Sequence, residues 1–116
     1  MTQEEKELLI KDLCGRLPYG VQYKDAHGYK KTIDIWSPEF HTALNTILYD
    51  EKPSLYLRPM SSMTEEEKAE LFQLMGNGTD IQRVDFYNTH HFDYRGLIPM
   101  GLALPAPEDM YSTKTE

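Results

Sequence analysis

The N-terminal stretch of the chain repeats its apolar positions with the period of an α-helix. Apolar side chains recur every three or four residues, at Leu9, Ile10, Leu13, Cys14 and Leu17. This spacing places them on one face of a helix. Thr2 and Glu5 have the spacing of a capping box at its start, and a glycine and a proline end it. We therefore predict a helix over 3–14 or 3–16, with Cys14 as a small buried residue.

The next stretch, 20–35, alternates apolar and polar residues with the period of a strand. Val21 and Tyr23 point to one side of the first half, and Ile33 and Ile35 to one side of the second. His27 and Gly28 lie between the halves, where Gly28 can adopt a positive φ. A hairpin is predicted here, and 54–57 is predicted as a further short strand.

The segment 37–49 fits two structures. Ser37, Pro38 and Glu39 form a helix start, and apolar residues follow at helical spacing. Its threonines and its β-branched and aromatic residues also suit a strand. The pattern favours a helix, but the alternative of strands stays open.

Two later helices are predicted. Thr64 and Glu67 repeat the capping-box spacing at the start of a helix over 64–75. A C-terminal helical segment over 82–98 follows from one stripe with intervals of three and four: Val84, Tyr87, His91, Tyr94 and Ile98. Gly96 weakens the end of this segment.

These elements predict an α+β fold, because the apolar stripes of the helices need a shared surface that a small antiparallel sheet supplies. The hairpin at 20–35 and the strand at 54–57 would form this sheet. The three helices would pack on it. We expect a single globular domain over 1–107 and a disordered tail over 108–116.

Composition narrows the function by exclusion. The chain has 116 residues, 40% of them hydrophobic, so it can bury a modest core. Its one cysteine cannot form an internal disulfide, which suits a reducing compartment. The N-terminus lacks the basic and apolar regions of a signal peptide, and no segment reads as a membrane span. We expect a cytoplasmic protein with no membrane association and no cofactor.

The candidate functional surface is the densest run of histidine, aromatic and charged residues. It comprises His90, His91, Asp93, Tyr94 and Arg95. His90 and Asp93 fall on the same side of the predicted helix and could bind a metal ion. The spacing lacks the two histidines four apart that mark zinc-protease helices. The alternative is that one histidine is packed, the other is exposed, and Asp93 orients His90 or pairs with a cation.

The hairpin carries the one basic patch, Lys24, Lys30 and Lys31. It could contact phosphates or protect a sheet edge from aggregation. The net charge of −7 makes nucleic acid an unlikely partner, since phosphate contacts need a basic surface.

Three stretches resemble a family of small uncharacterised proteins of Bacteroides and of their phages and mobile elements. They are EEKELLIKDLCGRLPYGV, YLRPMSSMTEEEKAEL and FYNTHHFDYRGLIPMGLALPAPEDMY. The resemblance implies a bacterial or phage setting and brings no catalytic residue. In related sequences the segment before the second stretch looks strand-like, which counts against a helix at 37–49. We expect a non-enzymatic accessory protein that binds another protein. The alternatives are a metal-binding domain or metal-dependent enzyme, and a weak nucleic-acid binder.

Overall fold

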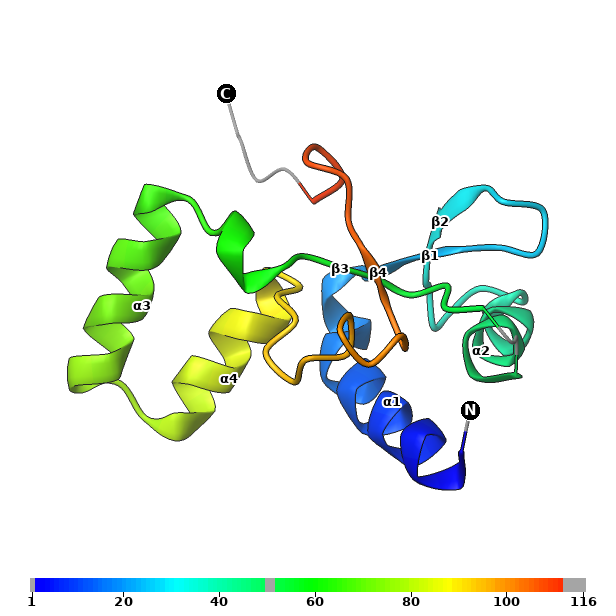
Figure 1. Cartoon of the computed structure of the whole chain (residues 1–116), viewed down its shortest axis with the longest axis horizontal. Helices are drawn as coiled ribbons and strands as arrows, with labels where there is room; N and C mark the ends of the chain where they lie inside the picture. Colours follow the sequence, from blue (N-terminus) through cyan, green and yellow to red (C-terminus); the bar gives the residue numbers. More distant parts are fainter. Residues whose placement is uncertain (1, 50–51, 112–116) are drawn as a thin grey trace.

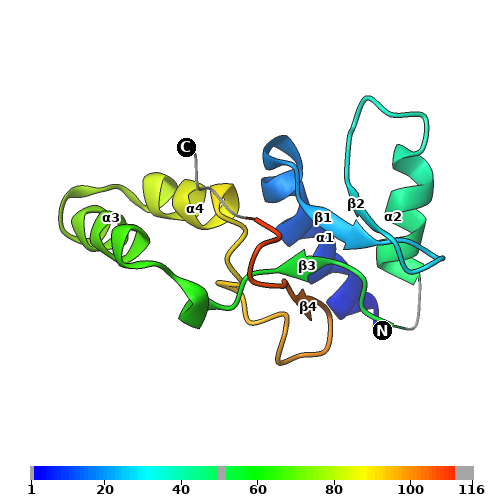
Figure 2. The same ribbon diagram turned by 90° about the horizontal axis from the view of Figure 1, so that it is seen from above.

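The chain alternates helices with short strands, and the predicted α+β class is confirmed. The computed structural model describes residues 2–49 and 52–111. Its helices are α1 (Gln3–Arg16), α2 (Phe40–Tyr49), α3 (Glu65–Asn77) and α4 (Asp80–Thr89), with 3-10 turns η1 (Leu17–Tyr19) and η2 (Met60–Ser62). Its strands are β1 (Gln22–Lys24), β2 (Lys30–Thr32), β3 (Tyr56–Leu57) and β4 (Leu104–Pro105). Figures 1 and 2 show α3 and α4 as a helical hairpin beside a body made of the other elements.

The predicted start of α1 is confirmed, but part of its predicted buried face is wrong. Thr2 and Glu5 form the capping box, with hydrogen bonds of 2.8 and 3.1 Å. Leu9 and Leu13 are buried as expected. Cys14 is exposed. The buried face of the helix consists of Leu9, Leu13 and two charged residues, Asp12 and Arg16. Cys14 points away from this face.

The sheet differs from the prediction in one pairing. β1 and β2 form the predicted antiparallel hairpin, and Gly28 in its turn has a φ of 89°. The segment at 54–57 joins the hairpin through one antiparallel bridge, Tyr23 to Leu55. Its strand β3 pairs parallel with β4, so the strands form two small sheets, one antiparallel and one parallel. β4 was not predicted, because a two-residue strand leaves almost no periodic signal.

The ambiguous segment is a helix. α2 begins at Phe40, after a turn in which the Ser37 hydroxyl accepts a hydrogen bond from the Glu39 N–H. Ala43 and Ile47 face the core. The hydroxyl of Thr46 donates to the carbonyl oxygen of residue 42, which satisfies a β-branched polar side chain within a helix.

One hydrophobic core lies between α1, α2 and the strands. Its buried members are Leu9, Leu13, Val21, Tyr23, Ile33, Ala43, Ile47, Leu55, Leu57, Leu97, Leu102 and Ala103. None of them belongs to α3 or α4. Outside this cluster, α4 buries the ring of Phe86 against Phe92, with 5.9 Å between the ring centroids. The helical hairpin therefore joins the body beside the main core cluster rather than within it.

The predicted helix over 82–98 is wrong beyond Thr89, where α4 ends. His91 has a φ of 61°, a left-handed conformation that stops a helix. The backbone then pairs with a distant segment. The N–H of Arg58 donates to the carbonyl oxygen of His91, and the N–H of Asp93 donates to that of Arg58, both at 2.8 Å.

Of the tail over 108–116 that was predicted to be disordered, residues 108–111 are described and 112–116 lie outside the described residues. The Tyr111 hydroxyl donates to the Tyr56 carbonyl oxygen at 2.9 Å and accepts the Gln22 N–H at 2.6 Å. Its ring stacks on His91 at 4.2 Å. Burial raises the pKa of this phenol well above its usual range. The tyrosine thus joins the end of the described chain to β1 and β3.

Candidate functional site

The α3–α4 hairpin is held by local contacts at its turn. α3 begins at a capping box formed by Thr64 and Glu67, as predicted. α4 begins at a second box, formed by Thr79 and Gln82. Arg83 of α4 donates from Nη1 to the carbonyl oxygens of Leu74 at 2.8 Å and of Gly78 at 3.1 Å. These bonds satisfy the open end of α3 and fix the two helices against each other.

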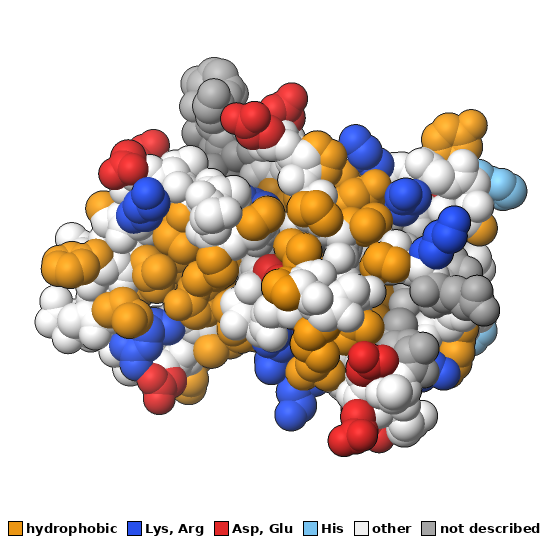
Figure 3. All heavy atoms as spheres, viewed as in Figure 1, with side chains coloured by type: hydrophobic (Ala, Val, Ile, Leu, Met, Phe, Trp, Pro, Cys, Tyr) orange, Lys and Arg blue, Asp and Glu red, His pale blue; other side chains and the backbone are white. Residues whose placement is uncertain are grey.

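Large apolar side chains remain exposed on both helices of this hairpin. On α3, Phe72 is 80% exposed and Met75 is 62% exposed. On α4, Ile81 is 74% exposed, and Val84 is also exposed. Figure 3 shows hydrophobic side chains gathered over α3 and α4 on the face in view. Exposed apolar clusters of this kind mark contact surfaces more often than isolated exposed residues do.

A groove of about 240 Å³ lies between α3 and α4. It is lined by two apolar side chains, three uncharged or weakly basic polar ones and two carboxylates: Leu74, Phe86, Gln82, Thr89, His90, Glu70 and Asp85. The carboxylates come from different helices, Glu70 from α3 and Asp85 from α4. The groove thus combines an apolar lining with negative charge from both sides.

Glu67 attaches the hairpin to the body. Its carboxylate accepts two hydrogen bonds from Arg58, both 2.8 Å, as well as the Thr64 N–H of its capping box. Burial alone would raise the pKa of Glu67, but these hydrogen bonds outweigh it and hold the pKa at about 2. The guanidinium of Arg58 also lies 4.2 Å above the ring of Phe92. Glu67 is the one buried residue of α3.

His90 lies against this anchor, and Asp93 does not share its site. The Nδ1 atom of His90 is 3.3 Å from Glu67, outside hydrogen-bond geometry, and its Nε2 atom is 4.0 Å from Glu70. Asp93 instead accepts the N–H groups of Leu97 at 2.7 Å and Ile98 at 2.9 Å. Across 2–49 and 52–111, no three His, Cys, Asp or Glu side chains come together to hold a metal ion. The geometry therefore gives the proposed His90–Asp93 metal pair no support.

His91 is packed. Its Nε2 atom is 2.9 Å from the Tyr19 carbonyl oxygen, so this nitrogen carries the proton of a neutral ring. Burial lowers the pKa of His91 to about 4. Tyr94 stacks on Tyr87 at 5.0 Å. Two of the five residues of the predicted functional surface, His91 and Tyr94, are thus packed against the rings of other residues.

Arg95, the last of the five, belongs to a buried ionic cluster that sequence analysis missed. Asp12 and Arg16 of α1 are fully buried and joined by two hydrogen bonds of 2.7 and 3.0 Å. Arg16 also donates to the Phe92 carbonyl oxygen at 2.6 Å, and Arg95 lies 3.2 Å from Asp12. The sequence could have indicated this ion pair, because Asp12 and Arg16 are four residues apart and lie beside the buried leucines of α1.

The lysines of the hairpin do not form one patch. Lys24 and Lys30 are exposed and directly opposite each other in the β1–β2 register. Lys31 forms ion pairs with two acidic neighbours, Asp25 at 3.3 Å and Glu39 at 3.9 Å. Lys24 and Lys30 form no ion pair within the described part of the chain, but two lysines give little of the charge that phosphate binding needs.

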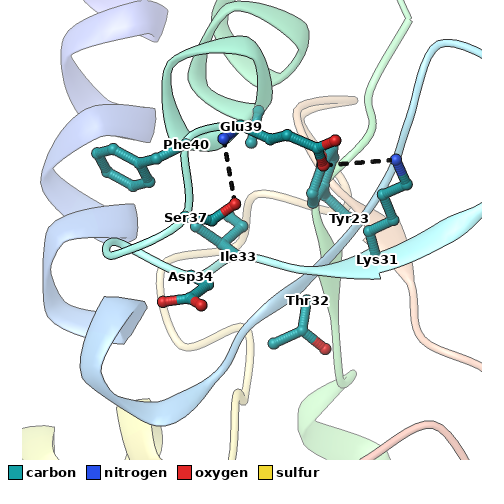
Figure 4. A pocket seen from close by; sticks show the side chains of 9 residues that line it. Tyr23, Lys31, Thr32, Ile33, Asp34, Ser37, Glu39 and Phe40 are labelled. Carbon is teal, nitrogen blue, oxygen red and sulfur yellow. Dashed lines mark hydrogen bonds and ion pairs between the residues drawn. The ribbon is translucent and has the colours of Figure 1, made fainter.

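Lys31 and Glu39 also border a small pocket between the β1–β2 hairpin and the start of α2 (Figure 4). Its volume is about 30 Å³, which is room for only a few water molecules. Tyr23 and Phe40 are among the side chains that line it. The pocket is too small to take a substrate.

Comparison with known proteins gives no family to which the chain can be assigned: no family model, curated protein or solved structure matches it. Among the described residues, no helix combines the length and the apolar character needed to cross a membrane.

Proposed function

We propose that this protein is a non-enzymatic accessory protein that binds another protein through its α3–α4 hairpin. The observation that carries the proposal is the exposure of Phe72, Met75, Ile81 and Val84 on two helices that lie outside the main core cluster. Leaving this much apolar surface in water is unfavourable, by about 25 cal/mol for each Å² of it. A partner that covers it supplies the missing contact.

The setting of the proposal is the cytoplasm of a bacterium. The resemblance of three stretches to small proteins of Bacteroides phages and mobile elements supports an accessory role there. The single free cysteine suits a reducing compartment. Neither the histidine segment nor the lysine hairpin offers a geometry that favours metal chemistry or nucleic-acid binding over protein binding.

The test compares two substitutions that remove an exposed aromatic side chain. Phe72→Ser changes the hairpin, and Trp36→Ser changes a loop residue that is 87% exposed elsewhere on the body. Each tagged variant and the wild type would be expressed near native level in a Bacteroides host, and the captured proteins quantified by mass spectrometry. The proposal predicts one partner that is lost with Phe72→Ser and kept with Trp36→Ser. A partner that both variants keep, or no reproducible partner at all, would refute it.

A further inference from the structure

Two carboxylates that line the groove between α3 and α4, Glu70 and Asp85, form no ion pair with a lysine or arginine of the described residues. Most charged side chains of the hairpin are paired: Glu67 with Arg58, Lys68 with Glu65, and Arg83 with Asp80. Within the described part of the chain, no lysine or arginine lies within ion-pair distance of Glu70 or Asp85. Among the described residues, the one ionisable side chain at ion-pair distance from either carboxylate is His90, 4.0 Å from Glu70.

The lining between these carboxylates is suited to an aliphatic chain. Leu74 of α3 supplies apolar surface, together with the small accessible part of Phe86 of α4, which is 4% exposed and lies against the ring of His90 at 4.7 Å. Long cationic side chains bury their methylene groups on such a surface while the charged end meets a carboxylate. An aliphatic chain with a positive end thus complements both the apolar and the acidic side chains of the groove.

We propose that the groove takes a lysine or arginine side chain from a basic helical segment of the partner protein. This inference rests on the proposed function and names the chemistry of its partner. The methylene groups lie against Leu74 and Phe86, and the cation lies between Glu70 and Asp85. A second copy of this chain is the poorer occupant, because it carries a net charge of −7 and the cations of its own hairpin are paired.

The experiment titrates the full-length protein with small probes that reproduce the occupant. The probes are n-butylguanidinium and n-butylammonium, with 1-butanol as the uncharged control of equal length. Binding is followed by the amide chemical shifts of residues 70–90 in two-dimensional NMR, at low ionic strength. The cations are expected to shift groove amides at millimolar concentration and with at least three-fold higher affinity than the alcohol, as two partly exposed charge contacts allow.

The matched variants separate the groove from the general negative charge of the protein. The double substitution Glu70→Gln/Asp85→Asn should abolish the advantage of the cations over the alcohol. Glu4→Gln/Glu7→Gln, which removes the same charge from the exposed side of α1, should leave it intact. Equal binding of alcohol and cations, or an advantage that survives the groove substitutions, would overturn the inference. The capture experiment on Phe72→Ser does not depend on either carboxylate, so the proposed function stands or fails separately.

Discussion

The buried ion pair of α1 makes a strong prediction about stability. In Asp12→Asn the side chain keeps its shape but loses its charge. Arg16, which is fully buried, is then left with the Phe92 carbonyl oxygen as its one strong acceptor. Removing one partner of a buried pair costs about 3–5 kcal/mol. We expect the lower end, about 3 kcal/mol, because the asparagine oxygen still accepts one hydrogen bond.

This loss is large but leaves the protein folded. A chain of this length has a free energy of unfolding of roughly 6–17 kcal/mol. The corresponding fall in Tm is roughly 12 °C, at about 4 °C for each kcal/mol. Urea unfolding at pH 7, followed by circular dichroism at 222 nm, gives the free energy, and a thermal scan gives Tm. Glu7→Gln, an exposed change on the same helix, should alter stability by no more than about 0.5 kcal/mol.

A double substitution tests the reason for the loss. In Asp12→Asn/Arg16→Met the stranded buried charge is gone, and Arg95, which is partly exposed, can turn to water. The double variant should therefore be more stable than Asp12→Asn alone. The reasoning is refuted if Asp12→Asn lies within about 1 kcal/mol of the wild type, or if the second substitution adds further destabilisation.

Three further predictions concern single sites. The pKa of His91 is lowered to about 4 from its ordinary 6.5, so the unfolded chain binds a proton that the folded chain resists. The free energy of unfolding should fall by up to about 3 kcal/mol from pH 6.5 to 4, and His91→Gln should remove most of this slope. The pKa of Glu67 is lowered to about 2, so its contribution is present above pH 4.5 and lost below it. Glu67→Gln should lower stability by about 2 kcal/mol at pH 7, against about 0.5 or less for the exposed Glu66→Gln. Substitution by alanine should have opposite effects on the free energy of unfolding at two glycines within helices, Gly15 and Gly76. At Gly15 a Cβ would lie 2.7 Å from a buried asparagine amide, and at Gly76 it would meet nothing within 4 Å. We expect a loss of about 1 kcal/mol at Gly15 and a gain of roughly 0.5–1 kcal/mol at Gly76.

Each of these predictions has an outcome that contradicts it. For His91, an unchanged slope between pH 6.5 and 4.5 in the glutamine variant would show that another group titrates. For Glu67, equal effects of the two glutamine substitutions would mean that the arginine bonds add nothing. For the glycines, urea unfolding that gives both alanine variants the same sign would show that the asparagine moves aside freely.

Sequence reasoning succeeded where structure is set by neighbouring residues. The capping boxes at Thr2 and Thr64 depend on a side chain three positions away, and both were predicted. The hairpin turn at Gly28 is equally local. The prediction of a helix as far as Ile98 was wrong. Apolar residues continue at helical spacing after Thr89, but the backbone there pairs with Arg58 instead of continuing the helix. No periodicity within 82–98 carries information about a partner so far away in the chain.

In the candidate site, too, features set by neighbouring residues could be predicted from the sequence, and features set by distant contacts could not. Sequence analysis selected the histidine segment for its unusual composition, but composition does not distinguish packing from chemistry. Asp93 is used to bond two backbone N–H groups, and His91 is buried under Tyr111. The apolar residues of α3 were predicted to face a core. Leu74 is half-buried beside α4, but Phe72 and Met75 are left exposed, and this outcome depends on the arrangement of whole elements.

The weak attachment of α3 has a consequence for amide hydrogen exchange. A local opening that releases α3 breaks the Glu67–Arg58 contact and separates Leu74 from α4, but leaves the main core cluster intact. Its amide protons should therefore exchange through local opening, at a lower free energy than those of α1, whose exchange requires the core to unfold. A protein that docks on the hairpin would slow exchange in α3 and leave α1 unchanged. Deuterium uptake of this single helix thus reports occupancy of the surface directly, even in a mixture where the partner has not been purified.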